Sequence, residues 1–417
     1  MDISLKYQYT YFIYPYVIEK ATYTEYLYKL FKDPKCKLKL FEKEKDIDIY
    51  SYFSFNARTC MFQSFEFDKQ NIKDIEEMDV VQKVKVLGKM PAISFEYEIP
   101  ENIHGKTQDQ NSGIFFQIQK IQLVVFNTGV CFLLLKTNLE ETTKFKDLLE
   151  FNYKFRLINY EKNGIKQAEN IKVQTNAFSS ISQLMDLILD VTGESLRKNE
   201  DMESFTDKFF TYSYACVDQE NWNENVDFNN IKDEFYKFSN ILTNDYNNYK
   251  DITEEDKFLA KDSKYVKFGF NRYGATVLSS GIDTYNYTKL PDIYENEYLY
   301  TLLICLYQKI YINKLILDLR SVNTKDLEKA REQFVKFTKT VWFKEITNNE
   351  IGIKLYKIWQ ETLDIDASYD ELKDKYNIIY KSKDLEDNKK LNNTLIVIIT
   401  IAFIINVITF IIFRMLM

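Results

Sequence analysis

The sequence predicts an α+β protein, in which a mixed α/β part is followed by helices, a long stalk helix and one transmembrane helix. Residues 1–291 hold all five prolines and nine of the ten glycines, among stretches where apolar and polar residues alternate. This pattern is typical of strands and turns. From residue 292 onward there is one glycine and no proline, and apolar residues recur at helical spacing. Residues 394–413 carry no charge at all.

Alternating residues in the first part predict strands at 7–14, 50–55, 62–67, 93–99, 114–126 and 130–136. The last two are joined by Asn127, Thr128 and Gly129, a short glycine-containing loop that fits a hairpin. Helices interrupt the strands. One is expected to begin at Ser180, with Gln183 completing a capping box and Gly193 ending it, and another covers 229–242.

An internal duplication is one interpretation of two aromatic motifs. Four residues recur at a constant offset of 215, with Tyr50, Phe53, Phe55 and Asn56 matching Tyr265, Phe268, Phe270 and Asn271. Thr10-Tyr11 and Thr211-Tyr212 also each precede a predicted helix. Two related halves, roughly 1–150 and 200–290, would explain the matches. Chance similarity in an aromatic-rich sequence is the alternative.

The helical part predicts four helices, and the last is the stalk. Apolar residues mark the first three around Leu306, Phe334 and Leu355. No helix breaker stands between Tyr369 and Phe413, so one helix of roughly 65 Å could run into a bilayer. Ile365, Leu372, Tyr376 and Ile379 form two heptad-like turns of apolar seam along it, which favours helix association. We therefore expect a homo-oligomer.

The membrane segment is the most specific feature of the sequence. Twenty uncharged residues in a helix span about 30 Å, which is the thickness of the hydrocarbon core of a bilayer. The polar positions and the end of this predicted anchor are Thr394, Thr400, Asn406, Thr409 and Phe413. The predicted organisation is an α/β region at 1–200, a second α/β subdomain at 201–291, a helical region at 292–368, a stalk at 369–393 and the transmembrane helix at 394–413.

The flanks of the span predict its orientation. Lys381, Lys383, Lys389 and Lys390 precede it, whereas only Arg414 follows it. Because an excess of lysine marks the cytoplasmic side, we expect a single-pass membrane protein with its N-terminal bulk in the cytoplasm, in a bacterial plasma membrane. The five scattered cysteines, with no CxxC pair, agree with a reducing compartment. The net charge of −7 argues against a nucleic-acid partner.

No catalytic constellation, metal site or cofactor motif is visible. The single histidine, His104, lies in the polar sequence NIHGKT and is interpreted as a solvated loop residue. Cys131 sits in an apolar run, where a buried thiol is expected. Gly269 and Gly274 have the spacing of a phosphate-binding loop, but Ala275 stands where the loop needs lysine, so a turn between strands is expected.

The stalk and span resemble the long helix and first membrane span of CorA-type divalent-cation transporters. The resemblance lies in Asn393, Thr400-Ile401 and Thr409-Phe410-Ile411, and in the order of cytosolic α/β domain, helices, stalk and membrane. The family's Gly-Met-Asn signature is absent, because FRMLM follows the span, and one span is present instead of two. The resemblance implies an oligomer whose spans line a pore.

These observations predict a membrane-anchored cytosolic binding or effector module that self-associates. In a CorA-like version it affects ion passage or membrane integrity when its α/β domain binds a small molecule or protein. The alternatives are a membrane-tethered scaffold for a soluble protein partner and, third, a membrane-bound enzyme, for which Arg272 and His104 are the residues to test.

Overall fold

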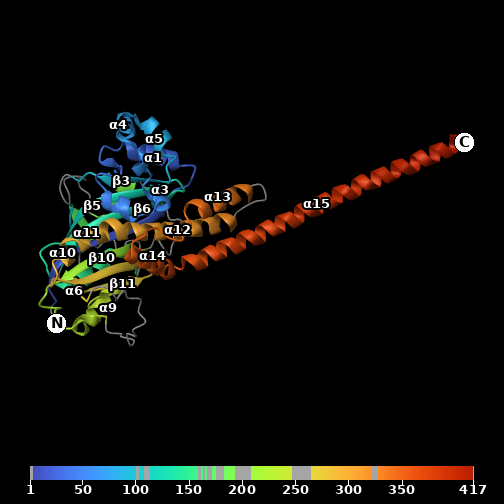
Figure 1. Ribbon diagram of the computed structural model, residues 1–417. Helices are drawn as coiled ribbons and strands as arrows, with labels where there is room; N and C mark the ends of the chain where they lie inside the picture. Colours follow the sequence, from blue (N-terminus) through green and yellow to red (C-terminus); the bar gives the residue numbers. More distant parts are fainter. Residues whose placement is uncertain are drawn as a thin grey trace. The chain divides into compact units, whose positions relative to one another are not determined.

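The computed structural model confirms the α+β class, with a mixed sheet, helices and one long C-terminal helix (Figure 1). It describes residues 3–99, 103–107, 113–157, 161–162, 165–166, 171–174, 183–192, 208–246, 264–320 and 327–416. The chain forms two compact units. The first comprises Met1–Tyr311 and Thr340–Ile365, and the second comprises Ile312–Lys339 and Asp366–Met417.

The first unit is built on a ten-stranded sheet, with a separate pair formed by β7 (Glu161–Lys162) and β8 (Ile165–Lys166). The strands of the large sheet are β1 (Leu5–Val17), β2 (Cys36–Lys39), β3 (Ala92–Tyr97), β4 (Ile103–Thr107), β5 (Phe115–Phe126), β6 (Val130–Leu139), β9 (Ile171–Gln174), β10 (Phe210–Val217), β11 (Val266–Asn271) and β12 (Gly274–Ser280). Their order is β11-β12-β10-β1-β6-β5-β3-β2, with β4 and β9 continuing beside β5. Only the pair formed by β10 and β12 is parallel among the described strands.

Helices and helical turns lie between and after these strands, and those of the first unit cover both faces of the sheet. Those before β10 are α1 (Tyr23–Lys32), α2 (Ile47–Tyr52), α3 (Phe55–Met61), η1 (Gln63–Glu66), α4 (Lys69–Glu77), α5 (Val80–Leu87), α6 (Phe145–Phe155) and α7 (Leu184–Thr192). Those after it are η4 (Phe228–Ile231), α9 (Lys232–Ser239), α10 (Tyr285–Thr288), α11 (Leu290–Ile293), the π-helical turn η5 (Tyr294–Tyr298), α12 (Leu299–Arg320), α13 (Leu327–Thr340), α14 (Glu350–Thr362) and α15 (Ile365–Leu416).

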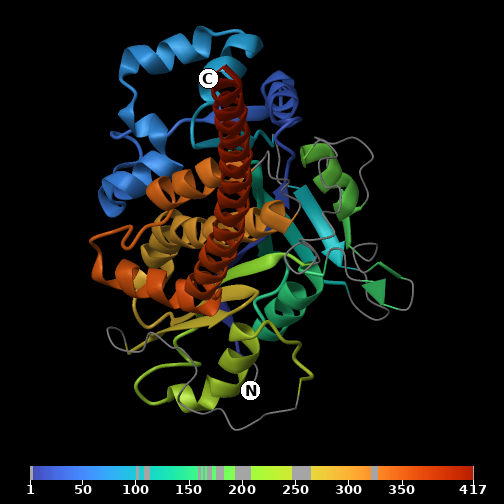
Figure 2. The same cartoon turned by 90° about the vertical axis from the view of Figure 1, so that its right-hand side faces the viewer.

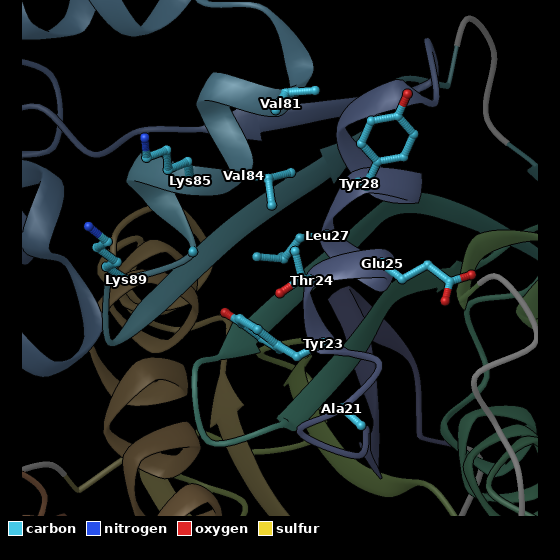
Figure 3. A pocket seen from close by; sticks show the side chains of 11 residues that line it. Ala21, Tyr23, Thr24, Glu25, Leu27, Tyr28, Val81, Val84, Lys85 and Lys89 are labelled. Atoms are coloured by element: carbon cyan, nitrogen blue, oxygen red, sulfur yellow. The ribbon is translucent and has the colours of Figure 1, made fainter.

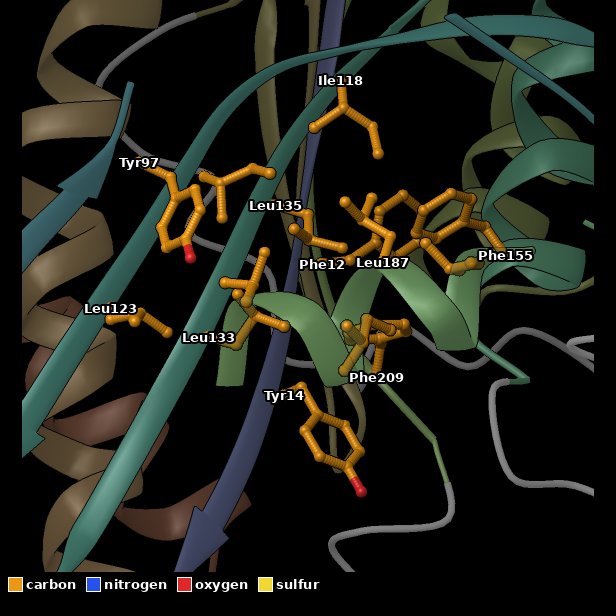
Figure 4. Packing of buried hydrophobic residues seen from close by; sticks show 14 of the residues in the cluster. Phe12, Tyr14, Tyr97, Ile118, Leu123, Leu133, Leu135, Phe155, Leu187 and Phe209 are labelled. Carbon is orange, nitrogen blue, oxygen red and sulfur yellow. The ribbon is translucent and has the colours of Figure 1, made fainter. Parts of the chain in front are cut away.

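Buried side chains of β1 contribute to the core on both faces of the sheet, because successive side chains of a strand point to opposite sides. Phe12 and Tyr14 point to the face covered by α6 and α7, where Phe12 lies 4.1 Å from the ring of Phe155 (Figure 4). Tyr9 and Tyr11 point to the other face, which α11, η5 and the first part of α12 cover. Figure 2 shows helices on both sides of the sheet, with α12 in gold and α6 in green.

Most predicted strands are confirmed, but two are wrong. Residues 50–55 and 62–67 lie in short helices, α2, α3 and η1, rather than in strands. Four of their aromatic side chains are buried, namely Tyr52, Phe53, Phe62 and Phe65, whereas Phe55 is 61% exposed. The ring centroid of Phe62 lies 4.8 Å from that of Phe41 and 5.0 Å from that of Tyr300. Aromatic residues spaced by two and three positions fit a strand or a helical turn equally well, so tertiary packing decided the outcome.

The predicted internal duplication fails at its main match. The segment around Tyr50 and Phe53 is helical, whereas the segment around Tyr265 and Phe268 forms β11. The strands predicted for two α/β regions, 1–200 and 201–291, also lie in a single sheet, because β10 pairs directly with β1. The other match, between Thr10-Tyr11 and Thr211-Tyr212, lies in these two neighbouring strands, where Tyr11 is opposite Tyr212.

The predicted helices agree with the structure in place and order. The helix expected at 229–242 is divided into η4 and α9, and the described part of the helix expected after Ser180 is α7. Ser180 and Gly193 themselves lie outside the described residues. The stalk and the membrane segment form one continuous helix, α15, of 52 residues.

Candidate functional site

The apolar part of α15 is the first candidate site. Among the described helices, α15 alone is long and apolar enough to cross a membrane, by length and composition. None of its most apolar 18-residue window is buried within the protein. Leu395, Ile399 and Phe403 are examples of large apolar side chains that are exposed there. An apolar surface of this size on a single helix is explained by contact with lipid or with other helices.

The predicted polar positions of the anchor satisfy their hydroxyl groups within the same helix. The hydroxyls of Thr394, Thr400 and Thr409 donate to the carbonyls four residues earlier, at 2.9, 2.8 and 2.7 Å. They therefore have no hydroxyl proton left for a bond to a neighbouring helix. Phe413 is exposed, and the side chain of Asn406 lies outside the described part of the chain.

The second unit contains an antiparallel helix pair on the N-terminal side of this apolar segment. Helix α13 runs along the first turns of α15 through aromatic and charged contacts. These contacts join Thr338 to Tyr369, Phe334 to Tyr376, Arg331 to the ring of Tyr380 and Glu328 to Lys383. Since residue numbers fall along α13 as they rise along α15, the two helices run in opposite directions.

The structure locates the predicted stalk seam inside the chain. Ile365 and Leu372 are completely buried, the ring of Tyr376 lies 5.0 Å from Phe334, and Ile379 is half-buried. Leu372 and Tyr376 thus need no second copy of the chain to be shielded from water. The homo-oligomer remains a prediction. A contact between stalks would have to use apolar residues of α15 other than Leu372 and Tyr376.

The candidate residues for catalysis lie apart from one another. His104 lies in β4 rather than in a loop, and its Nδ1 is 3.0 Å from an oxygen of Glu140. All five cysteines are buried, and burial raises the pKa of Cys36 and Cys60 to about 12. Thiols with such a pKa are poor nucleophiles at neutral pH. Cys131 is completely buried, as predicted.

The glycines at 269 and 274 belong to a hairpin, as expected. Gly274 begins β12, and a Cβ there would lie 2.2 Å from Ile241 and 2.8 Å from the carbonyl oxygen of Thr211. A Cβ on Gly269 would lie 2.3 Å from Ser239. Both glycines therefore allow α9 and β10 to approach the hairpin, and Arg272 is exposed at its turn.

A polar cluster that the sequence did not reveal lies between the sheet and η5. Lys136 of β6 forms an ion pair with Glu295 at 2.5 Å, and Glu295 also accepts a hydrogen bond from the hydroxyl of Tyr11 at 2.6 Å. The ammonium group of Lys136 lies 4.9 Å from the ring of Tyr9. Only the pairing of β1 with β6 brings these groups together, so sequence spacing gave no signal. Every charge in the cluster has a partner, which is typical of a structural contact.

A groove of about 740 Å³ lies between α1 and α5 (Figure 3). Its floor and walls are mainly apolar, with Leu27 and Tyr28 from α1 facing Val81 and Val84 from α5. Val81 is 65% exposed and Tyr28 is 40% exposed, so this apolar surface is open to solvent. It offers a place for an apolar side chain of a partner.

The described residues contain no group of three or more metal-ligating side chains. The described residues offer a helix long and apolar enough to cross a membrane, and an apolar groove on the folded domain. Comparisons of the chain with protein-family models, curated proteins and solved structures found no match.

Proposed function

We propose that this protein is a membrane-anchored binding module, in which residues 394–413 of α15 span the bilayer and the α/β domain lies in the cytoplasm. The observation that carries the proposal is an uncharged segment of twenty residues in a continuous helix, whose most apolar 18-residue window is not buried within the protein. Such a segment would be insoluble in water, whereas in a bilayer each exposed apolar side chain is in a favourable environment.

Membrane extraction tests this proposal. A lysine near the centre of a span costs about 2.5 to 3.5 kcal/mol of insertion free energy, so a double variant, Ile401→Lys with Ile404→Lys, should leave the membrane fraction. The matched control is Val81→Lys with Val86→Lys, two exposed apolar residues of the first unit. The control and the unmodified protein should both stay with the membrane after alkaline extraction. Equal extraction of both double variants would contradict the anchor.

Self-association is the second part of the proposal, and the CorA-like version depends on it. The exposed stalk residues Ile378 and Leu385 support it, because they are seven positions apart and so share one face of α15. In the CorA-like version, the associated spans affect ion passage or membrane integrity when the α/β domain binds a ligand. Ion flux from liposomes containing the full chain tests this version against an empty-liposome control.

The groove between α1 and α5 favours one alternative, a scaffold that holds a soluble protein partner at the membrane. In that case the liposomes would show no flux, and Val81→Lys would weaken the partner's binding without changing the amount of protein in the membrane. A membrane-bound enzyme is the third alternative. Hydrolytic turnover lost in Arg272→Gln or His104→Gln would support it.

A further inference from the structure

Arg156, the residue that follows α6, is a buried cation that forms no ion pair with a carboxylate of the described residues. Its side chain and backbone together are only 9% exposed, and its Nε has no hydrogen-bond acceptor. Across the described residues, no acidic group lies within ion-pair distance of its guanidinium. A buried guanidinium is normally paired, because removing its charge from water is costly.

The groups around Arg156 offset its charge only in part. The ring of Tyr153 lies 5.4 Å from the guanidinium carbon, and the C-terminal end of α6 contributes partial negative charge. The carboxylate of Glu150, on the same helix, is engaged elsewhere, since it is 3.8 Å from Lys154 and accepts the backbone N–H of Asn244 at 2.8 Å. Burial lowers the pKa of Arg156, which is the direction expected when no carboxylate stabilises the cation.

Two buried hydroxyl groups on the same side of the sheet also have no partner. These are the Oγ1 atoms of Thr211 on β10 and Thr276 on β12. Ser213 lies between them in the sheet, because it follows Thr211 by two positions and is opposite Thr276. The hydroxyl of Ser213, by contrast, is hydrogen-bonded to the hydroxyl of Thr10 at 2.7 Å and accepts a hydrogen bond from the amide Nδ2 of Asn152 at 3.1 Å. On this side of the sheet the hydroxyl of Ser213 is thus satisfied, whereas those of Thr211 and Thr276 are not.

Backbone contacts bring Arg156 to the start of β10, where Thr211 lies. The N–H of Phe209 donates to the carbonyl oxygen of Arg156 at 2.8 Å, and the N–H of Thr211 donates to that of Tyr273 at 2.9 Å. The phenol of Tyr273 is near enough to act electrostatically on Arg156. The turn that carries Tyr273 also carries the exposed Arg272, which adds positive charge at this end of the sheet.

We propose that Arg156 and Thr211 form a binding site for one oxyanion group, a phosphate or carboxylate, of a small soluble ligand. A guanidinium and a hydroxyl are both hydrogen-bond donors, and donors of this kind bind oxyanions with charge-assisted bonds. The site deepens the proposed function by giving the binding module a ligand class. The biological role of this site rests on the proposed function. The anion binding itself does not, because it can be measured without a membrane.

The test uses the full chain in a neutral detergent. Inorganic phosphate and acetate are titrated separately against chloride at constant ionic strength, and binding is followed by calorimetry and by the thermal unfolding temperature. Phosphate or acetate should raise that temperature above its value in chloride, and the comparison of the two anions identifies the oxyanion preferred. Arg156→Gln should weaken binding by roughly ten- to a hundred-fold, because hydrogen bonds to charged groups are lost.

Thr211→Val separates a ligand contact from a structural role. Because the hydroxyl has no partner in the free protein, the variant should unfold at an equal or higher temperature while binding the anion roughly tenfold more weakly. Arg331→Gln, an exposed arginine of the second unit, is the control and should bind normally. The proposal is overturned if neither anion exceeds chloride, or if binding is unchanged in Arg156→Gln. If Arg156→Gln fails to fold, unchanged binding in Thr211→Val overturns it.

Discussion

Tyrosine hydroxyls on one face of the sheet bond to the backbone of the helices that cover it. Tyr9 donates to the carbonyl oxygen of Pro291 at 2.8 Å, and Tyr212 donates to that of Tyr294 at 2.6 Å. Tyr214 donates to the carbonyl oxygen of Asn286. These carbonyls lie in α10, α11 and the π-helical turn η5. The rings of these tyrosines thus bury a large apolar area, while their hydroxyls donate hydrogen bonds to helix carbonyl groups that an irregular helix leaves without a regular partner.

Glu297, in the same π-helical turn, makes stability depend on pH. Burial, with a smaller contribution from the carboxylate of Asp48, raises the pKa of Glu297 to about 7. Between its usual pKa and this value the folded protein binds more protons than the unfolded chain, so the free energy of unfolding falls as the pH rises from about 5 to about 8. We expect Glu297→Gln to remove most of this fall.

Urea unfolding followed by tryptophan fluorescence at pH 5.5 and pH 8.5 measures this effect. The unmodified protein should lose more stability between the two values than the variant does. Asp48→Asn should show an intermediate loss, because it removes only the smaller contribution to the raised pKa. A variant that loses as much stability as the unmodified protein would show that Glu297 titrates normally.

At the scale of elements, α13 divides the stalk into a covered part and an exposed part. Contacts with α13 extend from Tyr369 to Lys383, whereas Ile378 and Leu385 remain 67% and 71% exposed. The apolar seam identified in the sequence is therefore used within the chain as far as Tyr376. Any contact between stalks must use the neighbouring face, since this is where exposed apolar residues repeat.

This division predicts that Ile378→Asp with Leu385→Asp lowers the oligomer order without disturbing the fold. Acidic residues that face each other in a contact between helices repel. The association constant of the oligomer should therefore fall by about tenfold or more. Light scattering of the detergent-solubilised protein measures the change. The matched control is Asp374→Glu with Asp384→Glu, which keeps the charge of the stalk. Unchanged mass in the double aspartate variant would show that this face makes no contact between copies.

At the scale of the whole molecule, the orientation of the predicted span in the membrane can be measured with introduced cysteines. All five native cysteines are buried, so a cysteine introduced on α15 provides the main reactive thiol. Lys381, Lys383, Lys389 and Lys390 on one side of the span predict that this side is cytoplasmic. A membrane-impermeant maleimide should then label Met415→Cys in intact cells, and Ser382→Cys only after the membrane is permeabilised. The reverse pattern would show the opposite orientation.

Features that depend on a local pattern of residues could be predicted from the sequence. The apolar segment at 394–413, the continuous α15, the hairpin at Gly129 and the long strands β1, β5 and β6 follow from periodicity or from a residue's backbone preference. Gly129, for example, has a φ of 88°, which glycine adopts without strain. Each of these signals lies in one continuous stretch of the sequence, so no distant contact was needed to interpret it.

Tertiary structure decided the features that depend on residues far apart in the chain. The helices at 50–55 and 62–67 form where aromatic rings meet Tyr300, and the seam around Leu372 and Tyr376 is covered by α13. Arg156 could be recognised as unpaired only after the fold had placed β10 and the turn at Tyr273 beside it. Whether a side chain is buried and whether it has a hydrogen-bond partner depend on the packed chain. For this reason the spacing of residues in the sequence did not reveal the proposed site at Arg156.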